Sequence, residues 1–185
     1  MVQSSQSEGT TLSAKLAEMR QAQDMPRSEI GFLKSEESKG SPGADEKIVL
    51  TSYPRSGNTL IRTYLEKLTR VYTGSDCDVR RPLNKQLQDM GMAGEGQIDS
   101  KVWIVKSHYP ERIGRAKFLA NKCIVIVRNP LDSIFSLFNM VATTTHSESI
   151  CKEALDKLLK STNMWEKFIK QEVSVWADFH NYWLE

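Results

Sequence analysis

Residues 48–68 read IVLTSYPRSGNTLIRTYLEKL. The stretch opens with the short β-branched run Ile48–Ser52, which is typical of a buried parallel strand. Pro54 and Gly57 then interrupt regular structure. From Thr59 onward, apolar residues recur at three- and four-residue steps, which predicts a helix with one apolar face. The stretch therefore predicts a strand, a loop and a helix in succession.

The same alternation continues along the chain. Residues 101–106 and 122–128 are two further apolar runs that predict strands. Helical patterns follow at residues 131–142, 148–160 and 163–185. Short strands that alternate with helices indicate an α/β fold with a parallel sheet covered on both faces. Because ligands bind at the carboxyl ends of such strands, we expect the three loops that follow the strands to converge on one edge.

Composition limits the class of protein. The chain has 185 residues, 39% of them hydrophobic and 26% charged, which is ordinary for a globular domain. The net charge of +2 argues against a nucleic-acid-binding protein with a broad basic surface. Residues 1–45 are polar and predict a disordered arm, which leaves residues 46–185 as the α/β domain.

Targeting signals and metal motifs are missing from the sequence. No stretch approaches the roughly 20 apolar residues of a membrane span, and the N-terminus lacks the apolar core of a secretory signal. The three cysteines have no metal-type spacing, so we expect reduced thiols and no metal site. The sequence predicts a cytoplasmic protein. A Golgi membrane location would require an anchor in a longer parent chain.

The loop at residues 53–59 has the chemistry of an anion site. Amide groups at a helix N-terminus favour a phosphate or sulfate. Gly57 permits close approach of the backbone, Ser56 and Thr59 supply hydroxyls, and Arg55 supplies a cation. The Walker spacing GxxxxGK[ST] is absent, which argues against an ordinary ATP- or GTP-hydrolysing protein. The alternative is a plain strand-to-helix turn with a polar cap.

The segment YPRSGNT between a strand and a helix resembles the 5′-phosphosulfate loop of sulfotransferases that use 3′-phosphoadenosine 5′-phosphosulfate (PAPS). With TGSD at residues 73–76, the extended sequence is similar to the sulfotransferase-like domain of WSC-domain-containing proteins. The resemblance implies a P-loop-like three-layer sandwich and PAPS as cofactor. It assigns the donor to Arg55, Ser56, Gly57, Asn58 and Thr59.

A second segment, KSHYP at residues 106–110, resembles the KTHLP segment of the same family. Histidine is the side chain that best accepts a proton near neutral pH. The resemblance implies that His108 is the general base for the acceptor. Lys106, together with Arg55, would neutralise charge on the transferred group. The alternative is that His108 is structural, as a single histidine after a strand commonly is.

A third segment, residues 128–136, resembles the part of the family that binds the 3′-phosphate. Arg128 stands at the strand end and Ser136 follows eight positions later. An arginine can contact a phosphate through two parallel hydrogen bonds. The alternative is that Arg128 pairs with Asp132 and that Ser136 only packs. Separate binding of the 3′-phosphate is what would distinguish PAPS from ATP.

Together the three segments predict a sulfotransferase that moves a sulfuryl group from PAPS to a hydroxyl or amine. The acceptor is expected to be a small molecule or a glycan, and the product nucleotide is adenosine 3′,5′-bisphosphate (3′,5′-ADP). The family's later RKGxxGxWK-like loop has no counterpart in the sequence, so we expect an α/β domain that is incomplete at its C-terminus. Two alternatives stay open: a catalytically weak nucleotide-binding or scaffold relative, and a kinase-like enzyme that uses ATP.

Overall fold

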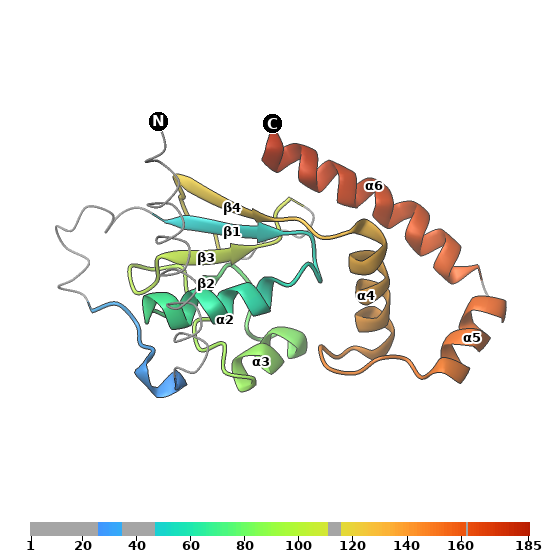
Figure 1. Ribbon diagram of the computed structural model, residues 1–185, viewed down its shortest axis with the longest axis horizontal. Coiled ribbons are helices and arrows are strands. Elements are labelled where there is room, and N and C mark those ends of the chain that lie inside the picture. Colours follow the sequence, from blue (N-terminus) through green and yellow to red (C-terminus); the bar gives the residue numbers. More distant parts are fainter. Residues whose placement is uncertain (1–25, 35–46, 111–115, 162) are drawn as a thin grey trace, which may run out of the picture.

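The computed structural model describes residues 26–34, 47–110, 116–161 and 163–185, and it shows an α/β fold (Figure 1). The strands are β1 (Ile48–Ser52), β2 (Gly74–Ser75), β3 (Ile104–Ser107) and β4 (Lys122–Ile126). The helices are the 3-10 helix η1 (Arg27–Glu29), α2 (Asn58–Thr69), α3 (Pro82–Asp89), α4 (Pro130–Thr143), α5 (Lys152–Ser161) and α6 (Met164–Leu184). The predicted fold class is confirmed.

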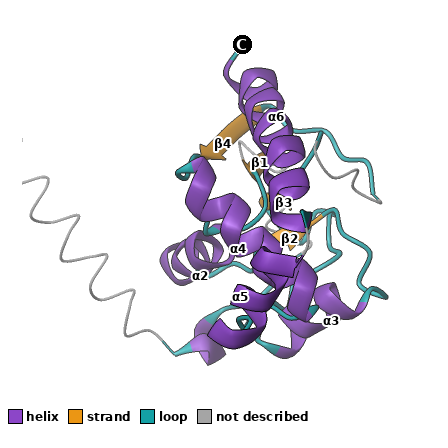
Figure 2. Ribbon diagram, turned by 90° about the vertical axis from the view of Figure 1, so that its right-hand side faces the viewer, coloured by secondary structure: helices purple, strands orange, loops and turns teal. Residues whose placement is uncertain are grey.

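All strand pairs in the described part of the sheet are parallel, in the order β2-β3-β1-β4. Thr51 pairs with Ser107, and Ser52 pairs with Ile126, so β1, β3 and β4 end at the same edge. Helix α2 lies along one face of the sheet, and the C-terminal part of α6 lies over the opposite side (Figures 1 and 2). The loops after these three strands therefore meet at one edge, as the sequence predicted.

Strand β4 is less buried than its apolar sequence suggests. In the described residues it pairs on one side only, with β1, and it ends at Ile126, where β1 also ends. Ile124 is 37% exposed and Val127 is 56% exposed. A parallel strand with a neighbour on each side and helices over both faces would be buried. The expectation that both faces are covered is therefore not met along β4.

Helix α2 turns a different face inward from the one its apolar pattern predicts. Its buried residues are Asn58, Arg62 and Glu66, which are four positions apart and so share one face. Leu60, in contrast, is 59% exposed. The charged side chains are buried because their polar partners lie in the loops beneath the helix, as described below. Apolar periodicity thus predicted the helix but not its orientation.

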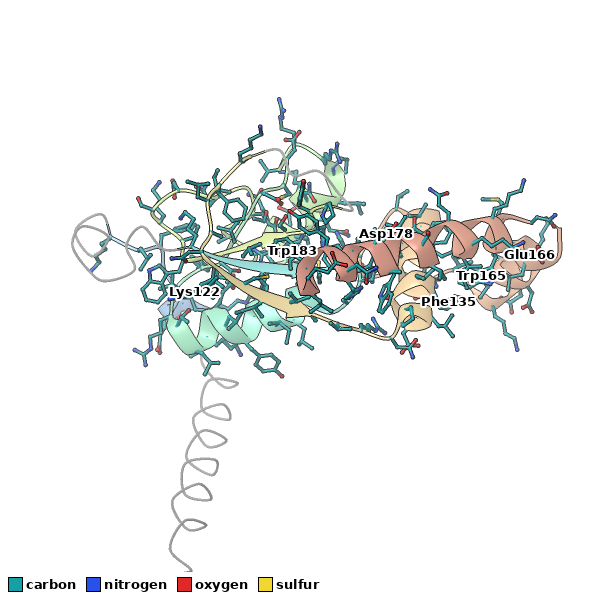
Figure 3. All side chains as sticks on the ribbon, turned by 90° about the horizontal axis from the view of Figure 1, so that it is seen from above. Lys122, Phe135, Trp165, Glu166, Asp178 and Trp183 are labelled. Carbon is teal, nitrogen blue, oxygen red and sulfur yellow. The ribbon has the colours of Figure 1, made fainter. Side chains whose placement is uncertain are left out.

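Helices α4 and α6 cross and close one side of the molecule. Pro130 opens α4, and the Asn129 side chain accepts a hydrogen bond from the Leu131 amide at 2.9 Å, which caps the helix. At the start of α6, the rings of Phe135 and Trp165 meet edge to face with centroids 5.7 Å apart (Figure 3). None of the helices in the described ranges is long and apolar enough to cross a membrane.

Residues 26–34, which belong to the predicted polar arm, pack against the domain. Ile30 is buried, and Gly31 forms an isolated bridge with Val71. The ring of Phe32 contacts that of Tyr72 at 5.0 Å between centroids. The other residues of the predicted arm lie outside the described residues.

Candidate functional site

The loop between β1 and α2 turns through two left-handed residues. Arg55 has φ 66° and Gly57 has φ 95°. The left-handed region costs an arginine free energy, and such residues cluster at functional sites. Helix α2 then begins at Asn58 with no acidic residue in its first turn. Because the first amides of a helix lack intrahelical carbonyl partners, this end of α2 presents donors to an anion.

Two side-chain contacts hold this phosphate loop (residues 53–59) in place. The Tyr53 hydroxyl donates to Oε2 of the buried Glu172 on α6, at 2.5 Å. At the other end of the loop, Asn58 Nδ2 donates to Ser52 Oγ at 3.2 Å. Nothing in the sequence linked Glu172 to the loop, because the two residues of the pair are 119 positions apart.

A cavity of about 770 Å³ opens at the end of the strands next to this loop. Six of the residues that the sequence predicted for the site line it, namely Arg55, Gly57, Asn58, Thr59, Lys106 and His108. Its opposite wall is largely apolar and comes from α3 and α4, including Leu83, Leu87, Leu137 and Met140. The predicted loops after β1 and β3 therefore line the same cavity.

Lys106 is a buried cation at the floor of the cavity. It lies on β3, is 7% exposed, and forms no ion pair with any residue that the structure describes. Burial lowers the pKa of Lys106, whereas the nearby charge of Glu95 raises it. A buried charge without a close partner is costly. An anion in the cavity would compensate it.

His108 is fixed at the edge of the same cavity. Its Nδ1 lies 2.6 Å from the Ser52 carbonyl oxygen. Because a carbonyl only accepts, Nδ1 carries the proton, and in the neutral ring Nε2 carries the lone pair. The adjacent ends of β1 and β3 set this contact, since Thr51 pairs with Ser107. The ring is thus held in the tautomer that a general base needs.

Arg128 and Ser136 contact the phosphate loop but do not line the described cavity. Arg128 Nη1 donates to the Arg55 carbonyl oxygen at 2.8 Å. Ser136 Oγ accepts from Arg55 Nε at 3.0 Å. The structure describes both Arg128 and Asp132 and shows no ion pair between them, so the predicted alternative pairing is not formed. The first and third motifs therefore meet at Arg55.

A buried ionic network lies beneath the cavity, and no sequence motif marks it. Arg62 of α2 pairs with Glu95, and both side chains are fully buried. Arg62 also donates to the Thr73 hydroxyl and carbonyl oxygens, at 2.7 and 3.0 Å. The second carboxylate oxygen of Glu95 accepts from Ser75 Oγ at 2.6 Å and from Cys77 Sγ at 2.8 Å. The network lies close to Lys106, since the charges of Glu95 and Arg62 both act on the pKa of that lysine.

Two pKa shifts describe the charge state of the network. Burial would raise the pKa of Glu95, but Arg62 and Lys106 outweigh it and lower the pKa to about 2. Burial and Glu95 raise the pKa of Cys77 to about 11. Glu95 is therefore ionised at neutral pH, and Cys77 is a protonated donor rather than a nucleophile.

His146 also lines the cavity, and the sequence did not single out this residue. It follows α4 in the polar run TTTHSES, which has no pattern that marks a site. Its Nδ1 lies 3.2 Å from Arg55 Nη1. Burial, Arg55 and Lys106 lower the pKa of His146.

Comparison with known proteins gives a consistent result. The family described as "Sulfotransferase domain" matches residues 45–184. The chain is 26% identical over 158 residues to a WSCD family member of Drosophila pseudoobscura pseudoobscura, covering 85% of this chain and 46% of the relative. It is 28% identical over 144 residues to a WSCD family member of Aedes aegypti, covering 77% and 42%. The chain thus spans less than half the length of these relatives. No solved structure matches it significantly.

Proposed function

Since the chain belongs to the sulfotransferase domain family, as its three motifs predicted, we propose that it transfers a sulfuryl group from PAPS to a hydroxyl or amine. The family supports sulfuryl transfer in general. The choice of donor and the residue roles are our proposal. One observation carries it: a buried lysine with no ion-pair partner among the described residues, a helix N-terminus and an arginine face one cavity. The acceptor would be a small molecule or a glycan, and the predicted cytoplasmic location stays a prediction.

The residues present fit an anionic donor. Ser56 is 6% exposed, and its Oγ has no hydrogen-bond partner among the described residues. A Cβ added at Gly57 would meet no atom within 4 Å, so the backbone there borders open space. Buried polar groups are ordinarily paired. An anion at the N-terminus of α2 would give the first amides of the helix an acceptor, and it would offer the Ser56 hydroxyl of the same loop a partner.

When bound, PAPS supplies a sulfuryl group that is already activated by its phosphosulfate linkage. The protein then contributes position and charge, as in phosphoryl transfer. We assign the 5′ end of the donor to residues 55–59 and the transferred oxygens to Lys106 and Arg55. Arg128 and Ser136 are proposed for the 3′-phosphate. His108 would take the acceptor proton at Nε2, while its Nδ1 stays bonded to Ser52.

Replacing Lys106 by methionine is expected to weaken binding of PAPS, measured without an acceptor, by about tenfold to a hundredfold. The reason is that a hydrogen bond to a charged group contributes about 1.5–3 kcal/mol. Titration calorimetry measures the dissociation constant directly. Lys101→Met is the matched control, because the Lys101 side chain is 59% exposed and lies outside the cavity. Equal affinities for both variants would remove Lys106 from the donor site.

Release of 3′,5′-ADP from PAPS, measured with a panel of hydroxyl and amine acceptors, tests the reaction itself. Acceptor-dependent release supports the proposal. Tight donor binding without release from any acceptor would instead favour the catalytically weak relative. Displacement of 3′,5′-ADP by equimolar ATP would favour the kinase-like alternative, since ATP lacks the 3′-phosphate.

A further inference from the structure

The Arg55 guanidinium, which lines the cavity, contacts three residues: Ser136, Met140 and His146. Its Nε donates to Ser136 Oγ at 3.0 Å, and its Nη2 donates to the His146 carbonyl oxygen at 3.3 Å. Its Nη1 lies 3.2 Å from His146 Nδ1 and 4.0 Å from the Met140 sulfur. His146 thus contacts both terminal nitrogens of the arginine, one through its ring and one through its backbone.

The His146 ring is in turn oriented by helix α3. Its Nε2 lies 3.1 Å from the Leu83 carbonyl oxygen, so Nε2 carries the proton and donates. Nδ1 must then hold the lone pair and accept from Arg55 Nη1. The His146 amide donates to Gln86 Oε1 at 3.0 Å. Helix α3 therefore holds His146 at two points: Leu83 binds its ring, and Gln86 binds its backbone amide.

We propose that His146 is a positioning residue for Arg55, which ties the phosphate loop to helix α3 and aims the guanidinium at an anion bound in the cavity. The link joins the loop assigned to the donor with the apolar wall formed by α3. The role in ligand binding rests on the proposed function. The contact between the two side chains does not depend on it.

The count of donors explains how one arginine can serve both partners. A guanidinium has five N–H groups. Ser136, the two His146 acceptors and the weak sulfur contact engage four of them, which leaves one on Nη2 for an anion. The contact with sulfur is the easiest to exchange for a charged oxygen. A lysine at position 55 has only three N–H groups, all on one atom, and could not serve Ser136, both His146 acceptors and an anion together.

The positioning contact requires a neutral His146. The charged groups that bear on its ring are Arg55 from the phosphate loop, Lys106 from β3 and Glu95 from the segment after α3. Burial and the two cations lower the pKa of His146, whereas Glu95 raises it less, so the ring is neutral at pH 7. On acidification the ring gains a proton, both nitrogens become donors, and the acceptor for Arg55 is lost. The hydrogen bond from Arg55 Nη1 to His146 should then be lost as the pH falls.

Calorimetric titration with 3′,5′-ADP provides the first test. We expect His146→Ala to weaken binding about tenfold, and His146→Asn, whose Oδ1 replaces the Nδ1 acceptor, to restore most of it. Arg55→Ala should abolish the effect of His146→Ala in the double variant, because the two residues act as one unit. Ser147→Ala is the matched control in the same loop, since Ser147 is exposed.

The second test needs no nucleotide. In ligand-free protein labelled with ¹⁵N-arginine, the Nη1–H signals of Arg55, which face His146 Nδ1, should be slow to exchange in the wild type and fast in His146→Ala. Their loss in Arg55→Lys assigns them. Unchanged exchange and unchanged affinity in His146→Ala would overturn the inference. If the wild type binds no 3′,5′-ADP while the exchange rate depends on His146, the donor proposal fails and the positioning contact stands.

Discussion

His108→Ala is expected to lower the turnover number of sulfuryl transfer by about 10²–10⁴-fold, the range that general-base catalysis supplies. The dissociation constant for 3′,5′-ADP should stay near the wild-type value. This split follows from the geometry, because His108 is assigned to the acceptor proton, whereas the donor is assigned to the phosphate loop and Lys106. Single-turnover measurement of PAPS consumption separates the chemical step from binding.

His108→Asn is the informative control for this variant. The side-chain amide of the introduced asparagine would still be able to donate to the Ser52 carbonyl, which keeps the structural hydrogen bond of 2.6 Å, but it has no basic lone pair. Both variants should therefore be equally slow. If the asparagine variant were as active as the wild type, His108 would have a structural role only.

Glu95→Gln is expected to destabilise the fold by about 3–5 kcal/mol, because it leaves the fully buried Arg62 guanidinium without its counter-charge. Unfolding in urea, followed by circular dichroism, measures the loss. Asp99→Asn is the control: Asp99 and Lys101 form an exposed pair at 3.9 Å, which should contribute less than about 1 kcal/mol. A loss of similar size in both variants would contradict the burial argument.

The buried pair of Arg62 and Glu95 also makes part of the protein's stability sensitive to acid. The pKa of Glu95 is lowered to about 2 in the folded state, below the value of about 4.3 for an exposed glutamate. Its contribution is therefore complete above the unfolded pKa and is lost as the pH falls through that value toward 2. The free energy of unfolding of Glu95→Gln should depend less on pH over this range than that of the wild type.

Local sequence patterns were sufficient for the strand, loop and helix at residues 48–68. β1 has the predicted bounds, and α2 begins one residue before the predicted Thr59. The loop is recognisable because its glycine, hydroxyls and arginine lie within seven consecutive residues. The bounds of β3 and β4 were less predictable. A strand ends where its partner ends, and β1 stops at Ser52.

The residues that complete the site could not be found in this way. Glu172 and His146 reach the phosphate loop from positions 119 and 91 residues away, through contacts that only the folded chain creates. Arg62 looks like a solvent-facing residue of an amphipathic helix, and its burial depends on Glu95 and Thr73 in separate loops. Long-range polar pairs leave no periodic signal in a sequence.

Thermal unfolding with and without 3′,5′-ADP tests most directly whether the cavity holds a doubly phosphorylated adenosine. At a ligand concentration about 100-fold above the dissociation constant, binding to the folded state adds about 2.7 kcal/mol, which raises the melting temperature by several degrees. We expect this rise with 3′,5′-ADP and a smaller one with the same concentration of ADP, which lacks the 3′-phosphate. An unchanged melting temperature at millimolar 3′,5′-ADP would contradict the account.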